Sequence, residues 1–234
     1  MRNQIKISAI IPAAGIGKRL GVGYNKQYIE LIDKPMVVRT IEVISEHPMI
    51  QEVIWVVGSQ EKAEAQDLVE LYQLHKVTNV CVGGKERVYS VINGFQMINQ
   101  ASNYILIHDG ARPLISLGEI ERCIEEAVSI GAAIVAVPVK DTIKYIDIEK
   151  KLIKNTPSRH TLWAAQTPQI MRTDWFSQAI KEIQELDQIT DDSMLLELLG
   201  KPVAVVRGSY ENIKVTTPED VEFAEMIIRR RLLS

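Results

Sequence analysis

Short apolar runs recur along the chain, separated by stretches whose apolar residues have helical spacing. Six runs rich in Val and Ile lie at residues 5–11, 53–57, 77–82, 104–107, 132–139 and 203–206. Such runs are typical of buried parallel strands. The clearest helical face between them joins Val88, Val91, Ile92, Phe95 and Ile98. This alternation predicts an α/β fold, a three-layer Rossmann-like sandwich with a mostly parallel sheet and crossover helices.

Several helix ends can be predicted from capping residues. Ser116 stands three residues before Glu119, the spacing of a capping box, and Gly131 follows as a C-terminal stop. Thr217 precedes a proline and an acidic first turn, which predicts the start of a last helix. The basic run 229–231 at its other end is expected to complement the negative helix C-terminus.

One segment has a different periodicity. Residues 142–147 and 151–156 alternate polar and apolar side chains around a polar turn, the pattern of a β-hairpin. A two-stranded hairpin is marginally stable alone, so something must cover it. We expect an arm at about residues 140–160, covered by a second copy of the chain in a homodimer. The alternative is a hairpin folded back on its own core.

Composition narrows the class of protein. The 234 residues, 46% hydrophobic and 24% charged, are expected to form a single domain over 1–234. With a net charge of -3 and no broad basic patch, we expect no nucleic-acid partner. Cys81 and Cys123 lack metal or disulfide spacing and are interpreted as core thiols. No window approaches the ~18 apolar residues of a membrane span, so we expect a cytoplasmic protein.

The first strand leads into a glycine-rich segment, residues 12–26, suited to close approach of an anion. A dinucleotide site would need glycine where Leu20 stands, and a P-loop would need Ser or Thr where Arg19 stands. Three cations, Lys18, Arg19 and Lys26, suit a triphosphate. A plain strand-to-helix turn is an equal alternative on this segment alone.

Further polar clusters follow other strands. Residues 83–90 place glycines, an arginine and a serine at the start of a helix, where anions bind. Residues 108–113 bring Asp109 to the carboxyl edge of the sheet, and one carboxylate can suffice for Mg²⁺ when phosphates supply other ligands. Alone, Asp109 would be interpreted as a turn cap and Lys214 as a solvated lysine.

Other polar residues are weaker candidates when taken singly. Hydroxyl or cationic groups in residues 141–144, 158–159 and 166–169 could hold a second phosphate. Residues 190–192 are typical of a helix cap followed by first-turn acids. His47, His75 and His160 lie apart and form neither a zinc pattern nor a triad.

Taken in order, these segments resemble the 2-C-methyl-D-erythritol 4-phosphate cytidylyltransferase family of the non-mevalonate isoprenoid pathway. The resemblance is carried by residues 12–19, 26–27, 83–87, 108–113, 138–144, 162–169 and 212–218. It implies a homodimeric enzyme that transfers CMP from CTP to methylerythritol 4-phosphate and releases pyrophosphate with Mg²⁺. The alternatives are a ribitol-5-phosphate cytidylyltransferase and, more distantly, a non-catalytic nucleotide-binding module.

The resemblance also implies site residues. CTP would be held by Pro12, Ala13, Ala14, Gly15, Gly17, Arg19, Lys26, Gly83, Gly84, Arg87, Ser90 and Lys214, with Arg19, Lys26 and Lys214 catalytic. The sugar phosphate would be held by Asp109, Arg112, Thr142, Arg159, Thr167 and Thr190, several of them from a partner's arm, with Asp109 also serving the metal. Asn25 stands where proline is frequent in the family, and Lys85 where an acid is frequent.

Overall fold

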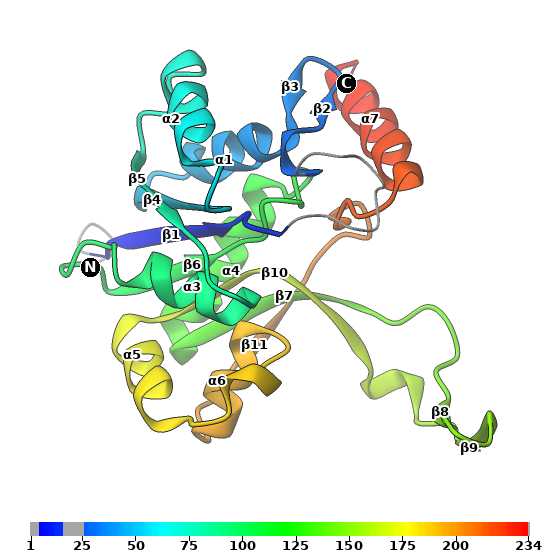
Figure 1. The fold of residues 1–234 in the computed structure, drawn as a ribbon. Coiled ribbons are helices and arrows are strands. Elements are labelled where there is room, and N and C mark those ends of the chain that lie inside the picture. The colour runs from blue at the N-terminus through cyan, green and yellow to red at the C-terminus, as the bar shows by residue number, and fades with distance from the viewer. Residues whose placement is uncertain (1–4, 16–25, 234) are drawn as a thin grey trace.

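The computed structural model describes residues 5–15 and 26–233 and is built on one central sheet (Figure 1). The sheet has seven strands in the order β11-β7-β10-β6-β1-β4-β5. These are β1 Ile7–Pro12, β4 Ile50–Val57, β5 Val77–Val82, β6 Tyr104–Ile107, β7 Ala132–Pro138, β10 Trp163–Arg172 and β11 Ala204–Arg207. The six predicted strands all run in one direction, and β10 runs against them between β6 and β7. The predicted mostly parallel sheet is confirmed.

Strand β10 was absent from the sequence prediction. Its middle contains Pro168, which cannot donate to a sheet ladder and argues against a central strand. The structure accommodates this stretch with a shift of register against β7 between Ala165 and Gln169. Beyond the shift, Ile170 and Met171 are buried on opposite faces of the sheet. The C-terminal part of β10 therefore lies in the core, while its polar middle lies beside the end of β6.

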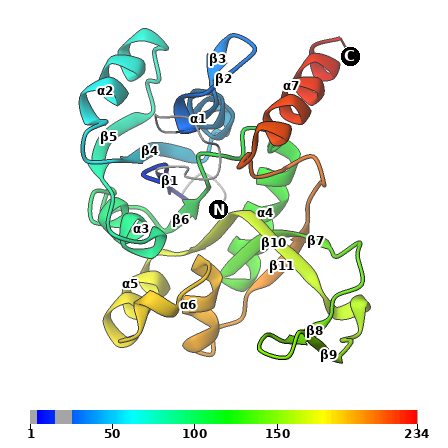
Figure 2. The ribbon, with the colours of Figure 1, turned by 45° about the vertical axis from the view of Figure 1, so that its right-hand side comes forward.

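Helices cover both faces of the sheet (Figure 2). One face packs on α1 Met36–Glu46, α2 Lys62–Leu71 and α4 Leu117–Ile130, and the other on α3 Arg87–Phe95, α5 Thr173–Glu182 and α6 Asp192–Leu198. Alternation along β1 explains the division, because Ala9 and Ile11 face the first group and Ile10 faces the second. The predicted three-layer sandwich is confirmed.

The predicted helix ends are confirmed as well. Ser116 and Glu119 form the capping box of α4, which ends at Gly131 with φ 112°. Thr217 caps α7 Pro218–Leu232 together with Asp220. The basic end of α7 does more than complement the helix, because Arg230 and Arg231 both pair with Glu211. This helix lies over a short antiparallel pair, β2 Glu30–Leu31 and β3 Lys34–Pro35.

The predicted hairpin projects from the ends of β7 and β10 (Figure 1). Its strands, β8 Tyr145–Asp147 and β9 Leu152–Asn155, are antiparallel, and a short 3₁₀ turn, η4 Arg159–Thr161, follows. Ile148 is 81% exposed and Leu152 61%. The alternative of a hairpin folded back on its own core is therefore wrong for this chain.

Two further short helices are η3 Lys26–Tyr28 and η5 Leu186–Gln188. Cys123 is fully buried and Cys81 half-buried, and both thiols are free. No helix in the described part of the chain is long and apolar enough to cross a membrane.

Candidate functional site

A cavity of about 250 Å³ opens at the edge of the sheet where β1, β5 and β6 end. Ligands of open α/β sheets bind at this edge. The predicted nucleotide residues Pro12, Ala14, Gly15, Gly84, Arg87, Ser90 and Lys214 all line it, and Asp109 lies in its wall. Segments separated by up to two hundred positions in the sequence therefore meet as expected.

The remaining predicted nucleotide residues are not among those that line the cavity. Ala13 is buried, and Gly83 packs so closely that an added Cβ would lie 2.6 Å from the Ala14 Cβ. Gly17 and Arg19 lie outside the described residues. Lys26, the last residue of the glycine-rich segment, begins η3.

The Gly83-Gly84 segment makes a tight turn into α3. The Gly84 amide donates to Ser90 Oγ at 3.1 Å, and the Ser90 hydroxyl donates to the Glu86 carbonyl at 3.2 Å. A Cβ at Gly84 would lie 2.3 Å from the Tyr89 Cβ, far inside contact distance. The turn therefore requires glycine, and Ser90 holds its shape.

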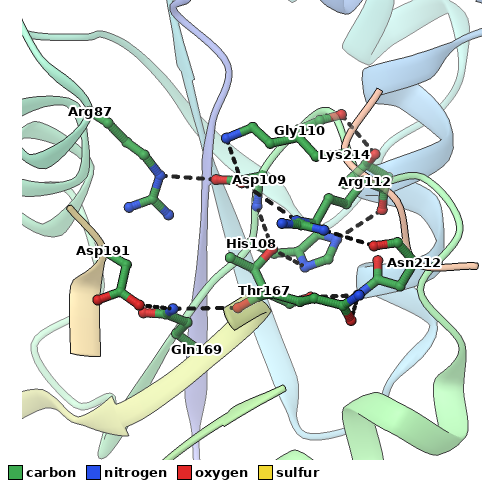
Figure 3. A network of polar contacts seen from close by, with 12 residues as sticks. Arg87, His108, Asp109, Gly110, Arg112, Thr167, Gln169, Asp191, Asn212 and Lys214 are labelled. Atoms are coloured by element: carbon green, nitrogen blue, oxygen red, sulfur yellow. Dashed lines mark hydrogen bonds and ion pairs between the residues drawn. The ribbon is translucent and has the colours of Figure 1, made fainter. Parts of the chain in front are cut away.

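Asp109 is the charged centre of the site (Figure 3). Arg87 Nε lies 3.0 Å from its Oδ1, while Lys214 Nζ and Arg112 Nε lie 2.9 and 3.6 Å from its Oδ2. Burial alone would raise the pKa of this carboxyl, but Arg87, Lys214 and Arg112 together hold it well below its usual range. Asp109 is therefore ionised at neutral pH.

The loop that carries Lys214 is held by hydrogen bonds on both sides of the lysine. Arg112 Nη1 donates to the Asn212 carbonyl at 2.7 Å, and the Val215 amide donates to the Ala111 carbonyl at 2.8 Å. The fully buried Asn212 amide group donates to the Thr167 carbonyl at 2.9 Å (Figure 3). Lys214 therefore reaches Asp109 from a fixed backbone.

His108 and Thr167 orient the backbone of Asp109. His108 Nε2 lies 3.0 Å from the Arg112 carbonyl, which only accepts, so Nε2 carries the proton and Nδ1 accepts from the Thr167 hydroxyl. The Thr167 oxygen in turn accepts from the Asp109 amide at 3.0 Å. Burial lowers the pKa of His108 to about 4, which keeps the ring neutral. The whole chain of hydrogen bonds is thus fixed at neutral pH.

The predicted acceptor residues fall into two groups. Arg112 and Thr167 both contact Asp109, which lines the cavity. Thr190 is exposed just before α6, while Thr142 and Arg159 lie on the arm, which projects away from the sheet (Figure 1). Within the described chain, therefore, a single copy does not bring all six together.

Sequence reasoning missed Asn212 and Asp192 as parts of this network. Asp192 is 1% exposed, and its Oδ2 lies 2.7 Å from Arg87 Nη2. Its place among the acids after Thr190 was interpreted as a helix cap. Asp192 stands three and four positions before the buried Leu195 and Leu196, which places it on the buried face of α6. Only this helical spacing could have indicated a charged partner inside the protein.

Comparison with known proteins agrees with the geometry. The family model for IspD, 2-C-methyl-D-erythritol 4-phosphate cytidylyltransferase, matches residues 7–230. Proteins of that name from Alkaliphilus metalliredigens and Alkaliphilus oremlandii are each 47% identical to the chain, over 97% and 99% of it and 94% and 98% of their own lengths. The crystal structure of 4-diphosphocytidyl-2C-methyl-D-erythritol synthase from Anaerococcus prevotii is similar with a TM-score of 0.83 at 30% identity, covering 97% of this chain and 100% of that one.

The fold and the site thus define a nucleotidyltransferase, with a cavity lined by glycines and cations at the carboxyl edge of a Rossmann-like sheet. The chain belongs to the 2-C-methyl-D-erythritol 4-phosphate cytidylyltransferase family, as its sequence motifs predicted.

Proposed function

We propose that the chain transfers CMP from CTP to 2-C-methyl-D-erythritol 4-phosphate, forming 4-diphosphocytidyl-2-C-methyl-D-erythritol and pyrophosphate. The observation that carries this proposal is the ionised Asp109 among Arg87, Arg112 and Lys214 in the wall of the cavity. A non-catalytic nucleotide-binding module would have no need of this charged cluster. The named relatives support methylerythritol phosphate over ribitol phosphate as acceptor.

The reaction needs charge stabilisation more than a base. A phosphate monoester has its second pKa at ~6 and is already largely a dianion at neutral pH. Its oxygen attacks the α-phosphorus of CTP, and the bond to the bridging oxygen breaks so that pyrophosphate leaves with the electron pair. The protein must bring two anions together and stabilise the charge on the α-phosphate and the leaving group. Lys214, with Arg19 and Lys26 from the glycine-rich segment, would supply that charge.

The donor set fits a Mg²⁺ ion that arrives with the nucleotide. The described residues contain no group of three or more His, Cys, Asp or Glu side chains that could hold a metal. Asp109 offers one ionised carboxylate, which suffices when phosphate oxygens and water complete the shell. Asp109 would hold the ion, which when bound would neutralise phosphate charge.

We also propose that the arm serves a second copy of the chain. Tyr145, Leu152 and Ile153 are each more than half exposed on a hairpin that would be marginal alone. In a homodimer these side chains would be covered, and Thr142 and Arg159 would reach the partner's acceptor site. Arg159 Nη1 here donates to the Lys140 carbonyl at 2.8 Å, which holds it at the base of the arm.

One assay tests the reaction. The purified chain with Mg²⁺ is given each of the four nucleoside triphosphates together with methylerythritol 4-phosphate or ribitol 5-phosphate, and pyrophosphate is measured. We expect release only with CTP and methylerythritol 4-phosphate. A preference for ribitol 5-phosphate would assign the chain to that alternative, and no release with any pair would refute catalysis.

A further inference from the structure

A buried carboxylate behind the site has no role in the proposed reaction. Asp192 is the first residue of α6, is 1% exposed, and pairs through Oδ2 with Arg87 Nη2 at 2.7 Å. Neither of its oxygens meets hydrogen-bond geometry with a partner within residues 5–15 and 26–233, so the ion pair with Arg87 is what holds the group. A buried group that is only partly satisfied requires an explanation.

Stability does not supply that explanation. Burial raises the pKa of Asp192, against the charge of Arg87, because an ionised carboxylate loses its water. Replacing a buried ion pair by apolar residues is often neutral or stabilising. The helix start does not need Asp192 either, because Asp191 accepts from the Met194 amide at 3.1 Å and from Gln169 Nε2 at 3.0 Å.

The geometry of Arg87 does supply one. Its guanidinium spans two carboxylates, with Nε 3.0 Å from Asp109 Oδ1 and Nη2 2.7 Å from Asp192 Oδ2. An arginine with a single carboxylate partner prefers to take both of its oxygens in a two-pronged contact. Asp109 Oδ2 is the oxygen that Lys214 approaches at 2.9 Å. An Arg87 released from Asp192 would therefore compete with Lys214 for Asp109.

We propose that Asp192 is a positioning residue: it anchors the far end of Arg87 so that Arg87 occupies only one oxygen of Asp109 and leaves the other to Lys214. This inference rests on the proposed function. Asp192 acts through Arg87 and does not touch the cavity, which Arg87, Asp109 and Lys214 line.

The test begins with Asp192→Asn, which keeps the volume and removes the charge. We expect kcat for pyrophosphate release to fall by about tenfold or more, the scale of one lost charge-assisted contact, while the KM for CTP changes less than threefold. Asp192→Glu, which keeps the carboxylate, is expected to restore kcat to within threefold of the parent. Asp191→Asn is the matched control: it removes a charge from the neighbouring residue, keeps an oxygen that can cap α6, and is expected to leave kcat unchanged.

A double-mutant cycle with Arg87→Gln separates positioning from general loss of structure. In the Arg87→Gln background, Asp192→Asn is expected to change kcat less than twofold, because the anchored group is gone. The same tenfold loss in both backgrounds, or an unaltered kcat in Asp192→Asn, would overturn the proposal. So would an Asp192→Glu enzyme as slow as Asp192→Asn.

A crystal structure of Asp192→Asn keeps the test independent of the reaction. We expect Arg87 to have turned onto both oxygens of Asp109, and an unmoved Arg87 would contradict the inference. If the parent chain releases no pyrophosphate from any substrate pair, the proposed function fails, and this structure still decides how Arg87 is held.

Discussion

At the scale of single residues, the cations around Asp109 differ in how firmly they are held. Arg87 also pairs with Asp192, and Arg112 also donates to the Asn212 carbonyl. The Lys214 side chain, which contacts Asp109, is 39% exposed. An exposed ammonium group on a long flexible stem can change partners at little cost. Lys214 is therefore the cation best placed to move onto a substrate phosphate.

We predict that Lys214→Ala lowers kcat by about a hundredfold, the scale of one lost stabilising group in a transition state. The KM for CTP should change much less, since the charge acts on the developing leaving group. Steady-state kinetics measure both values, and thermal unfolding checks that Tm is kept. Lys181→Ala, on the outer side of α5, is the control and should behave like the parent. Near-normal turnover in Lys214→Ala would remove Lys214 from the mechanism.

His108 makes stability depend on pH. Its pKa is lowered from 6.5 to about 4 by burial, so the unfolded chain binds the proton first as pH falls. The stabilisation is complete above pH 6.5 and is lost as pH falls toward 4. We predict a loss of about 2 kcal/mol between pH 7 and pH 5 from this group. Urea unfolding at both pH values measures it.

The control is His108→Gln, which has no ionisable ring. This variant should be less stable at pH 7, because the hydrogen bonds to Arg112 and Thr167 are altered, but its loss between pH 7 and pH 5 should be smaller by that amount. An equal loss in both proteins would assign the acid sensitivity to other groups.

Asp109, Arg112 and Lys214 could be predicted because each follows a strand and matches a family motif, and parallel strands bring their carboxyl ends together. The partners that hold them could not. Asn212 acts through a carbonyl contact with Arg112, one hundred positions earlier, and Asp192 through a side chain on another helix. Neither contact leaves a local pattern in the sequence.

At the scale of elements, the turn into α3 is packed too tightly to accept a side chain at Gly84. We predict that Gly84→Ala raises the Kd for CTP by roughly tenfold or more, because the added Cβ would displace Tyr89 or the backbone of the turn. Calorimetric binding of CTP measures the effect without turnover.

Gly118→Ala is the matched control for this change. Gly118 lies in α4, and among the described residues an added Cβ would meet only Arg122, at 3.5 Å. This variant should be more stable by about 0.5–1 kcal/mol and bind CTP normally. Unchanged CTP affinity in Gly84→Ala would show that the turn tolerates a side chain.

Strand β10 shows the limit of prediction at this scale. The parallel strands could be predicted from continuous Val and Ile, and the hairpin from alternation. In β10 the residues Gln166, Thr167 and Pro168 are typical of a loop, and tertiary contacts outweigh that preference. The residues that break the strand pattern are those that serve the site.

At the scale of the whole molecule, the arm projects away from the sheet (Figure 1), and none of its described residues lines the cavity of its own chain. In the proposed homodimer, the Lys214 and Arg159 that serve any one active site come from different chains. Two chains with defects in different places should then complement each other.

At low acceptor concentration, the Lys214→Ala and Arg159→Ala variants should each have low activity alone. We predict that an equal mixture with exchanged subunits recovers about a quarter of the parent activity. Half the dimers would be mixed, and one site in each mixed dimer would be intact. Lys214→Ala mixed with Asp109→Ala is the control and should recover nothing, because both defects fall in the same half of the site. Absence of recovery in the first mixture would refute the shared site.

The path of β10 has one more consequence. This strand leaves the arm at Trp163 and, four residues later, its Thr167 hydroxyl bonds the Asp109 amide. Trp163 to Ala165 pair with β7, and the pairing resumes at Gln169. A push or pull on the hairpin is therefore carried through this pairing into a short unpaired step, and from there to Asp109 through the Thr167 hydrogen bond. Assembly of the dimer and alignment of Asp109 therefore depend on the same stretch of backbone. A partner chain that bound the arm weakly would leave Asp109 less precisely positioned.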